Sequence, residues 1–231
     1  EEMNQTPKAS VGVTTQFDEA TRILTATVTV TALENMEGTY TVAGVVTEDA
    51  VSGTSALYDQ SNIYANIWGY MGGFENMPDP IPSYMIAYDP VARQMLGGYE
   101  GEGGFPTVLA KDQTYVHTFT YSIPEGYDKN YMRVVGILLN GNGTVDNAGI
   151  SAYLNGKSNA APKFTSVPSL SIPAGINYTY NIYVHDTDDK QLVVTAEEKP
   201  EWLTFTQNDY KSATLSGKAS EPGVYTVVLK V

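Results

Sequence analysis

The most constraining feature of this sequence is a strict alternation of apolar residues and threonine between Leu24 and Ala32. Because successive side chains of a β-strand point to opposite faces, the alternation predicts a strand whose apolar row faces a core. The threonines then form the solvent-facing row, where a β-branched polar residue suits a pleated surface.

Similar patterns predict further strands in the first two thirds of the chain. We expect them at residues 10–17, 39–48, 115–123, 132–140 and 144–152. The stretch 132–140 is almost continuously apolar, which is typical of a central strand covered on both faces. No amphipathic helix longer than about three turns is evident in the sequence.

A run of small, polar and proline residues at 155–162 (NGKSNAAP) predicts a domain boundary. Beyond it, short alternating stretches predict strands at residues 178–185, 191–196, 214–216 and 224–231. The predicted fold class is therefore all-β, with two tandem β-sandwich domains at residues 1–156 and 160–231.

A long segment, at about residues 52–111, interrupts the first predicted domain without clear periodicity. Such a long irregular segment inside a compact domain either carries function or packs its own side chains as an Ω-like excursion. It is rich in glycine, proline and aromatic residues, including Tyr58, Tyr64, Trp68, Tyr70, Phe74, Tyr84, Tyr88 and Tyr99.

Composition excludes several classes of function. The chain has 26 acidic and 13 basic residues, a net charge of −13, so it repels phosphate backbones and we expect no nucleic-acid partner. It has no cysteine and two histidines, which excludes disulfides, thiol catalysis and cysteine-ligated zinc. No apolar stretch reaches the roughly 18 residues of a membrane span, and the first residues do not resemble a signal peptide.

The second half resembles the cadherin-like, immunoglobulin-like repeat of dystroglycan and many bacterial surface proteins. The resemblance implies an immunoglobulin-like sandwich. It rests on Pro168 and on residues 159–164 (NAAPKF), 175–180 (GINYTY), 186–189 (DTDD), 200–203 (PEWL), 215–217 (LSG) and 223–225 (GVY).

The first half resembles the outer membrane protein twenty-eight-related family of bacterial surface lipoproteins. This resemblance implies an exported protein tethered to a Gram-negative surface through a lipid anchor upstream of residue 1. The thioredoxin-like region of that family has no counterpart here, so no redox activity is carried over. The matching residues are 43–49 (AGVVTED), 88–98 (YDPVARQMLGG), 134–140 (VVGILLN) and 144–148 (TVDNA).

The sharpest polar cluster is Asp186, Asp188 and Asp189. In an extended segment Asp186 and Asp188 point the same way and could share a calcium ion, which prefers oxygen ligands. The cadherin-like resemblance places such a pair beside the interdomain linker, where Asn159 could donate a carbonyl oxygen. The alternative is a solvated acidic turn.

A second candidate site combines Trp68, Tyr70 and Phe74 with Asn66 and Glu75. Aromatic rings can stack on the apolar face of a sugar, whose hydroxyl groups then bond to amides and carboxylates. The alternative is a small core beneath the long segment, because aromatic residues bury large areas. The exposure of the three rings distinguishes these hypotheses, whereas Trp202 is expected in the sandwich core.

The remaining candidates have weaker support. A glycosidase would need paired carboxylates, for which the candidates are Asp79, Asp89, Glu100 and Glu102, although acids in such loops are typically solvated. We expect His117 to be a packed or hydrogen-bonded strand residue. We expect His185 to be a surface strand residue or a neighbour tuning the aspartate cluster, and Arg93 to be part of a structural ion pair.

These patterns favour a non-enzymatic cell-surface interaction, adhesion or structural protein. The alternative is a carbohydrate-binding component of a surface glycan-uptake system. The expected partners are proteins or glycans at the cell surface, and calcium is the one expected cofactor. The expected location is extracytoplasmic, either associated with the outer membrane or secreted.

Overall fold

The computed structural model describes residues 6–189 and 191–231. Its strands pair antiparallel, and the helices it describes are 3₁₀ turns of three residues. The predicted all-β fold class is confirmed. The chain forms two compact units: unit 1 contains residues up to 49 and 90–160, and unit 2 contains residues 50–89 and 161–231.

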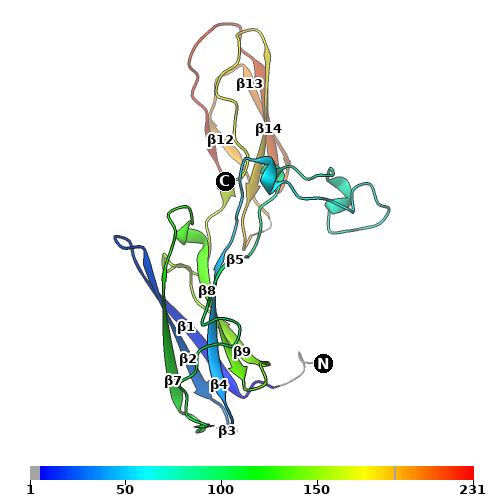
Figure 1. The fold of residues 1–231 in the computed structure, drawn as a ribbon. Coiled ribbons are helices and arrows are strands. Elements are labelled where there is room, and N and C mark those ends of the chain that lie inside the picture. The colour runs from blue at the N-terminus through cyan, green and yellow to red at the C-terminus, as the bar shows by residue number, and fades with distance from the viewer. Residues whose placement is uncertain (1–5, 190) are drawn as a thin grey trace. The chain divides into compact units, whose positions relative to one another are not determined.

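Unit 1 is built from two main sheets (Figure 1). The first has the order β1-β2-β7, with bounds Ala9–Asp18, Ile23–Ala32 and Thr114–Ser122. The second has the order β5-β4-β8-β9, with bounds Val91–Leu96, Tyr40–Glu48, Met132–Asn140 and Val145–Ile150. A short pair, β3 (Met36–Glu37) and β6 (Val108–Leu109), and a 3₁₀ turn, η5 (Lys129–Tyr131), complete the unit.

The alternation that predicts β2 determines which of its faces enters the core of unit 1. Its apolar row, from Leu24 to Ala32, is fully buried, while the threonines between remain partly exposed. Val42, Val134 and Leu138 of the second sheet are buried in the same cluster. The core therefore lies between the two sheets, as a sandwich requires.

Unit 2 contains a four-stranded and a two-stranded sheet. The larger has the order β10-β11-β14-β13, with bounds Lys163–Phe164, Asn177–His185, Ser212–Lys218 and Leu203–Asp209. The smaller pairs β12 (Thr195–Glu198) with β15 (Val228–Lys230). The strand expected at residues 224–231 is thus much shorter in the structure, and β13 was not expected.

Residues 50–89 form a long excursion in unit 2, drawn in cyan and teal in Figure 1. Its two arms are joined by isolated β-bridges, Val51 to Tyr88 and Gln60 to Ile81. Beyond the second bridge lies its tip, which we define as residues 62–77. The excursion contains three 3₁₀ turns, which are η2 (Ala56–Tyr58), η3 (Phe74–Asn76) and η4 (Ser83–Met85).

The segment expected to be irregular at about residues 52–111 is therefore divided between the units, and it is not irregular throughout. Residues 91–96 form β5 at the edge of a sheet in unit 1. Arg93 lies in the inward row of this strand, so the apolar alternation that would have revealed the strand is broken.

Candidate functional site

The aromatic side chains at the tip are exposed. Trp68 is 100% exposed, Tyr70 is 86% exposed and Phe74 is 40% exposed. Apolar neighbours are also exposed, including Ile63, Ile67 and Met71. The three rings therefore do not form a small core of their own, and they are available to a ligand.

The tip is nevertheless internally braced, chiefly by the buried side chain of Asn62. Its amide nitrogen Nδ2 donates to the carbonyls of Phe74, Met77 and Pro78 at 2.8, 3.2 and 3.2 Å. Its Oδ1 accepts from the backbone amide of Tyr64 at 3.2 Å. One side chain thus joins the two ends of the tip, which fixes the backbone that carries the rings.

The sequence predicts Glu75 as a ligand contact. In the structure its side chain stabilises the backbone turn at the tip. Its Oε2 accepts from the backbone amides of Met71 and Gly73, both at 3.0 Å. Hydrogen bonds from its own backbone amide and from those two amides lower the pKa of Glu75. The backbone N–H of Asn66 donates to the backbone carbonyl of Glu75 at 3.1 Å. The side chain of Asn66 is exposed.

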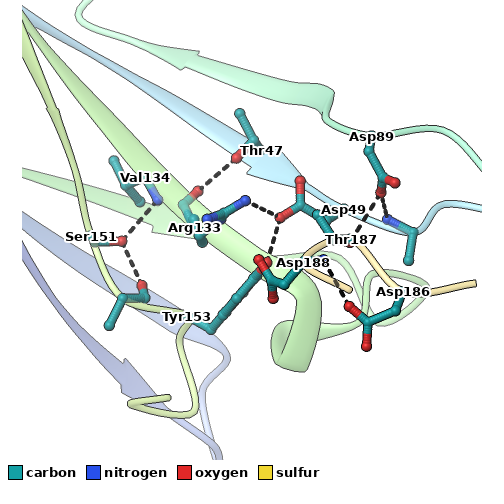
Figure 2. Close-up of polar contacts among 12 residues, drawn as sticks. Thr47, Asp49, Asp89, Arg133, Val134, Ser151, Tyr153, Asp186, Thr187 and Asp188 are labelled. Carbon is teal, nitrogen blue, oxygen red and sulfur yellow. Dashed lines mark hydrogen bonds and ion pairs between the residues drawn. The ribbon is translucent and has the colours of Figure 1, made fainter. Parts of the chain in front are cut away.

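The base of the excursion is attached to strand β11 and the turn after it. Asp89 accepts hydrogen bonds from the backbone amide of Ala50 and from His185. It also accepts one from the Thr187 hydroxyl (Figure 2). Burial acts to raise the pKa of Asp89, but the bonds from His185 and Ala50 outweigh it and the net shift is downward. His185 therefore anchors the excursion.

A second attachment lies at η4. The Thr165 hydroxyl donates to the carbonyl of Tyr84 at 2.9 Å, and the ring centroids of Tyr84 and Tyr183 are 5.5 Å apart. The excursion is therefore attached to the sandwich of unit 2 at more than one point. These attachments hold the arms that carry the tip.

The aspartate cluster forms a turn. Oδ1 of the buried Asp186 accepts from the backbone amides of Asp188 and Asp189 at 2.7 and 2.9 Å. Asn159, in unit 1, donates its side-chain amide to the carbonyl of Ala160 at 2.7 Å. No group of three or more His, Asp or Glu side chains within residues 6–189 and 191–231 is placed to hold a metal, and calcium stays a prediction.

Unit 1 holds a charged network that sequence reasoning missed, at the end of β4. Figure 2 shows the Arg133 guanidinium and the Tyr153 hydroxyl meeting on the Asp49 carboxylate, at 2.5 and 2.8 Å. Beside it, Glu48 accepts from Arg93 Nε at 2.8 Å. Both acids are buried, so these ion pairs compensate for lost hydration.

Arg93 therefore forms the structural ion pair that was expected. Its partner Glu48 is 45 residues distant in sequence, on the neighbouring strand. The pairing of β4 with β5 brings the two side chains together. Local acidic residues in the sequence, such as Asp89, could not have revealed this partner.

The acids considered for a glycosidase have structural contacts within their own units. Asp79 accepts from the backbone amide of Asn62 at 2.9 Å, and Asp89 anchors the excursion. Glu102 bonds to His117 Nε2 at 2.9 Å, and the carbonyl of Glu100 accepts from the Thr41 hydroxyl at 2.7 Å. Three of the four carboxylates therefore have a structural contact, whereas the contact of Glu100 is made by its backbone carbonyl.

Unit 2 also contains an apolar groove of about 950 Å³. It is lined by residues of the sandwich and of the segments before β11 and β15, among them Leu170, Tyr178, Trp202, Tyr225 and Val227. Trp202 packs edge-on against Tyr225 and contacts the core cluster, as expected for a sandwich residue. Its indole Nε1 is buried without a hydrogen-bond partner within the described part of the chain.

Comparison with known proteins assigns no family. No protein-family model matches the chain, and no curated protein matches it. A solved structure of red sea bream transglutaminase aligns with 98% of this chain at 9% identity and a TM-score of 0.27. This chain spans 29% of that protein, and a likeness so weak carries no argument about fold or activity.

Among the described residues, no helix combines the length and apolar character needed to cross a membrane.

Proposed function

We propose that this chain is a non-enzymatic binding protein that recognises carbohydrate through the aromatic tip of its 50–89 excursion. The observation that carries this proposal is the full exposure of Trp68 beside a largely exposed Tyr70. Large exposed aromatic groups are unfavourable in water, and their concentration at one place marks an interaction surface.

The bracing of the tip supports binding by a preformed surface. Asn62 and Glu75 fix the backbone that carries the rings, so little conformational entropy would be lost when a ligand binds. Rigid aromatic side chains give a large contact area at low entropic cost. A pyranose ring offers the flat apolar face that such side chains can cover.

A cell-surface location completes this proposal. It is supported by the resemblance of the first half to surface lipoproteins and by a composition that is low in charge and rich in tyrosine, glycine and proline. The role would be adhesion to a glycan, or its capture before uptake.

A second candidate is docking to a protein at the cell surface. It is favoured by aliphatic residues that are exposed on the same excursion, since Leu57 is 95% exposed and Ile63 is 76% exposed. Protein interfaces combine aromatic and aliphatic side chains in this way.

A glycan array probed with the full chain tests the first candidate. We expect Trp68→Ala to lower the signal on the bound glycans and to leave the melting temperature unchanged, because an exposed side chain contributes little to stability. Tyr99→Ala is the matched control, since Tyr99 is an aromatic residue of unit 1 that is 88% exposed. An array without any bound glycan, or equal binding by Trp68→Ala, would contradict carbohydrate recognition at the tip.

A further inference from the structure

We infer that the ligand of the tip is an uncharged saccharide and that the site discriminates against anionic saccharides. This inference rests on the proposed function and narrows it to a substrate class. Its basis is the charge of the excursion: residues 50–89 contain Asp59, Glu75, Asp79 and Asp89 but no lysine, arginine or histidine.

The four carboxylates are fixed parts of the excursion. Asp59 accepts from the backbone amide of Ser83 at 2.8 Å, and Asp79 accepts from that of Asn62 at 2.9 Å. Glu75 and Asp89 are likewise held by backbone amides. These bonds hold the four acidic side chains within the excursion, which has no basic side chain to balance them.

An anionic sugar would find no cationic partner on this excursion. Carboxylate and sulfate groups are bound in proteins by arginine or lysine, or by clustered backbone N–H groups. The backbone amides of Met71 and Gly73 form such a pair at the tip, but both already donate to the Glu75 carboxylate. An incoming anion would lose hydration and also meet the charge of Glu75.

The tip also exposes neutral groups that could contact a sugar. They include the rings of Trp68 and Tyr70, the Tyr70 hydroxyl and the amide of Asn66. Rings can cover the apolar face of a sugar, while a hydroxyl and an amide can each donate to and accept from its hydroxyl groups. This combination suits a neutral saccharide.

Binding of matched polysaccharides by the full chain tests the inference. The probes are pairs that share a backbone and differ in charge: hydroxyethylcellulose with carboxymethylcellulose, and dextran with dextran sulfate. Affinity electrophoresis in gels containing each polymer gives a dissociation constant for each. We expect at least one neutral polymer to bind, and its anionic counterpart to bind at least about tenfold more weakly, a difference of about 1.4 kcal/mol.

Equal or tighter binding of the anionic polymers would overturn the inference while leaving carbohydrate recognition in place. Binding of no polymer in the panel and of no glycan on the array would instead overturn the proposed function, and the inference with it. Neutral binding should also persist at about 0.5 M salt, because screening weakens only charge-dependent contacts.

A charge variant at the tip gives an independent test. Ile63 is 76% exposed, so Ile63→Lys adds a cation to the tip without disturbing a core. We expect this variant to bind the anionic polymers more tightly than the parent chain does, while Ile63→Glu binds them more weakly. If both variants discriminate between the polymers as the parent chain does, charge at the tip does not set the preference and the inference is wrong.

Discussion

At the scale of single residues, the buried side chain of Asn62 braces the tip through several hydrogen bonds. Its side chain is 4% exposed and bonds to backbone groups on both sides of the exposed rings. Removing such a side chain leaves several partly buried carbonyl groups without their donor. The rings would then be carried by a mobile backbone, and the preformed surface would be lost.

We predict that Asn62→Ala lowers the free energy of unfolding by about 1–3 kcal/mol, the cost of leaving buried polar groups unsatisfied. It should also accelerate amide hydrogen exchange at residues 62–77 and weaken glycan binding. Urea denaturation and hydrogen exchange measure the first two effects. Asn76→Ala is the control, because Asn76 is exposed in the same tip. Normal exchange in Asn62→Ala would show that the tip does not depend on this side chain.

The sequence predicted candidate residues at the tip but did not reveal their structural contacts. Trp68, Tyr70 and Phe74 were predicted as a site or as a small core, and only the tertiary structure shows which rings are covered. Glu75 was predicted as a ligand contact because carboxylates bind sugar hydroxyls. Its role in the turn depends on the backbone amides of Met71 and Gly73, which both point toward its carboxylate. The amino-acid composition does not reveal the direction of a backbone amide.

At the scale of elements, the sandwich of unit 1 depends on close approach between its two sheets. Gly136 in β8 lies against β1 and β2, where an added Cβ would be 2.7 Å from Val13 Cγ2 and 3.0 Å from Val28 Cγ2. Only a residue without a side chain fits at this distance. The glycine therefore lets a central strand pack directly on the facing sheet.

We predict that Gly136→Ala lowers the free energy of unfolding by about 1–3 kcal/mol through overpacking. Gly126→Ala is the matched control, because an added Cβ there would have no heavy atom within 4 Å. Chemical denaturation of both variants measures the difference. An equal effect of the two substitutions would show that β8 does not pack this closely.

At the same scale, the attachment of the excursion to β11 depends on the hydrogen bonds of Asp89. The stability that this attachment provides should therefore depend on pH. The pKa of Asp89 is lowered on folding from its ordinary 3.8. Its contribution to stability is therefore complete above pH 3.8 and is lost as the pH falls through the folded-state pKa.

We predict that Asp89→Asn lowers the melting temperature at neutral pH and makes its decline below about pH 4 shallower than in the parent chain. Thermal melts across the acid range measure this, with Glu221→Gln as an exposed control in the same unit. Parallel curves for Asp89→Asn and the parent chain would mean that Asp89 does not carry this dependence.

The strands that could be predicted from sequence are those with a clean period of two. β1, β2, β4, β7, β8 and β9 lie where the alternation or the apolar run placed them. β5 and β13 were missed, because β5 carries Arg93 in its inward row and β13 is largely exposed at a sheet edge. Expected strands at 191–196 and 224–231 form only over short stretches.

At the scale of the whole molecule, the chain is acidic and divides into two units that each have a core. The exposed aromatic tip belongs to unit 2, although its sequence lies between strands of unit 1. Sequence reasoning placed it in the first domain, because neighbours in sequence are the default neighbours in space.

The calcium hypothesis also belongs to the whole molecule, since the resemblance places the ion at a domain linker. It predicts that a chelator lowers the melting temperature of the full chain, and that Asp188→Asn removes this response. Melts with EDTA and with added calcium measure it, and a melting temperature unaffected by either would remove the hypothesis.

The most direct test of the binding surface uses its own indole as the reporter. The chain has two tryptophans, so Trp202→Phe leaves Trp68 as the one fluorescent indole, and no hydrogen bond within the described residues is lost from Trp202 Nε1. We predict that titration of this variant with the neutral polysaccharides shifts the Trp68 emission to shorter wavelength and that the shift saturates. A Trp68 emission that stays constant while the full chain binds one of these polymers would contradict recognition at the tip.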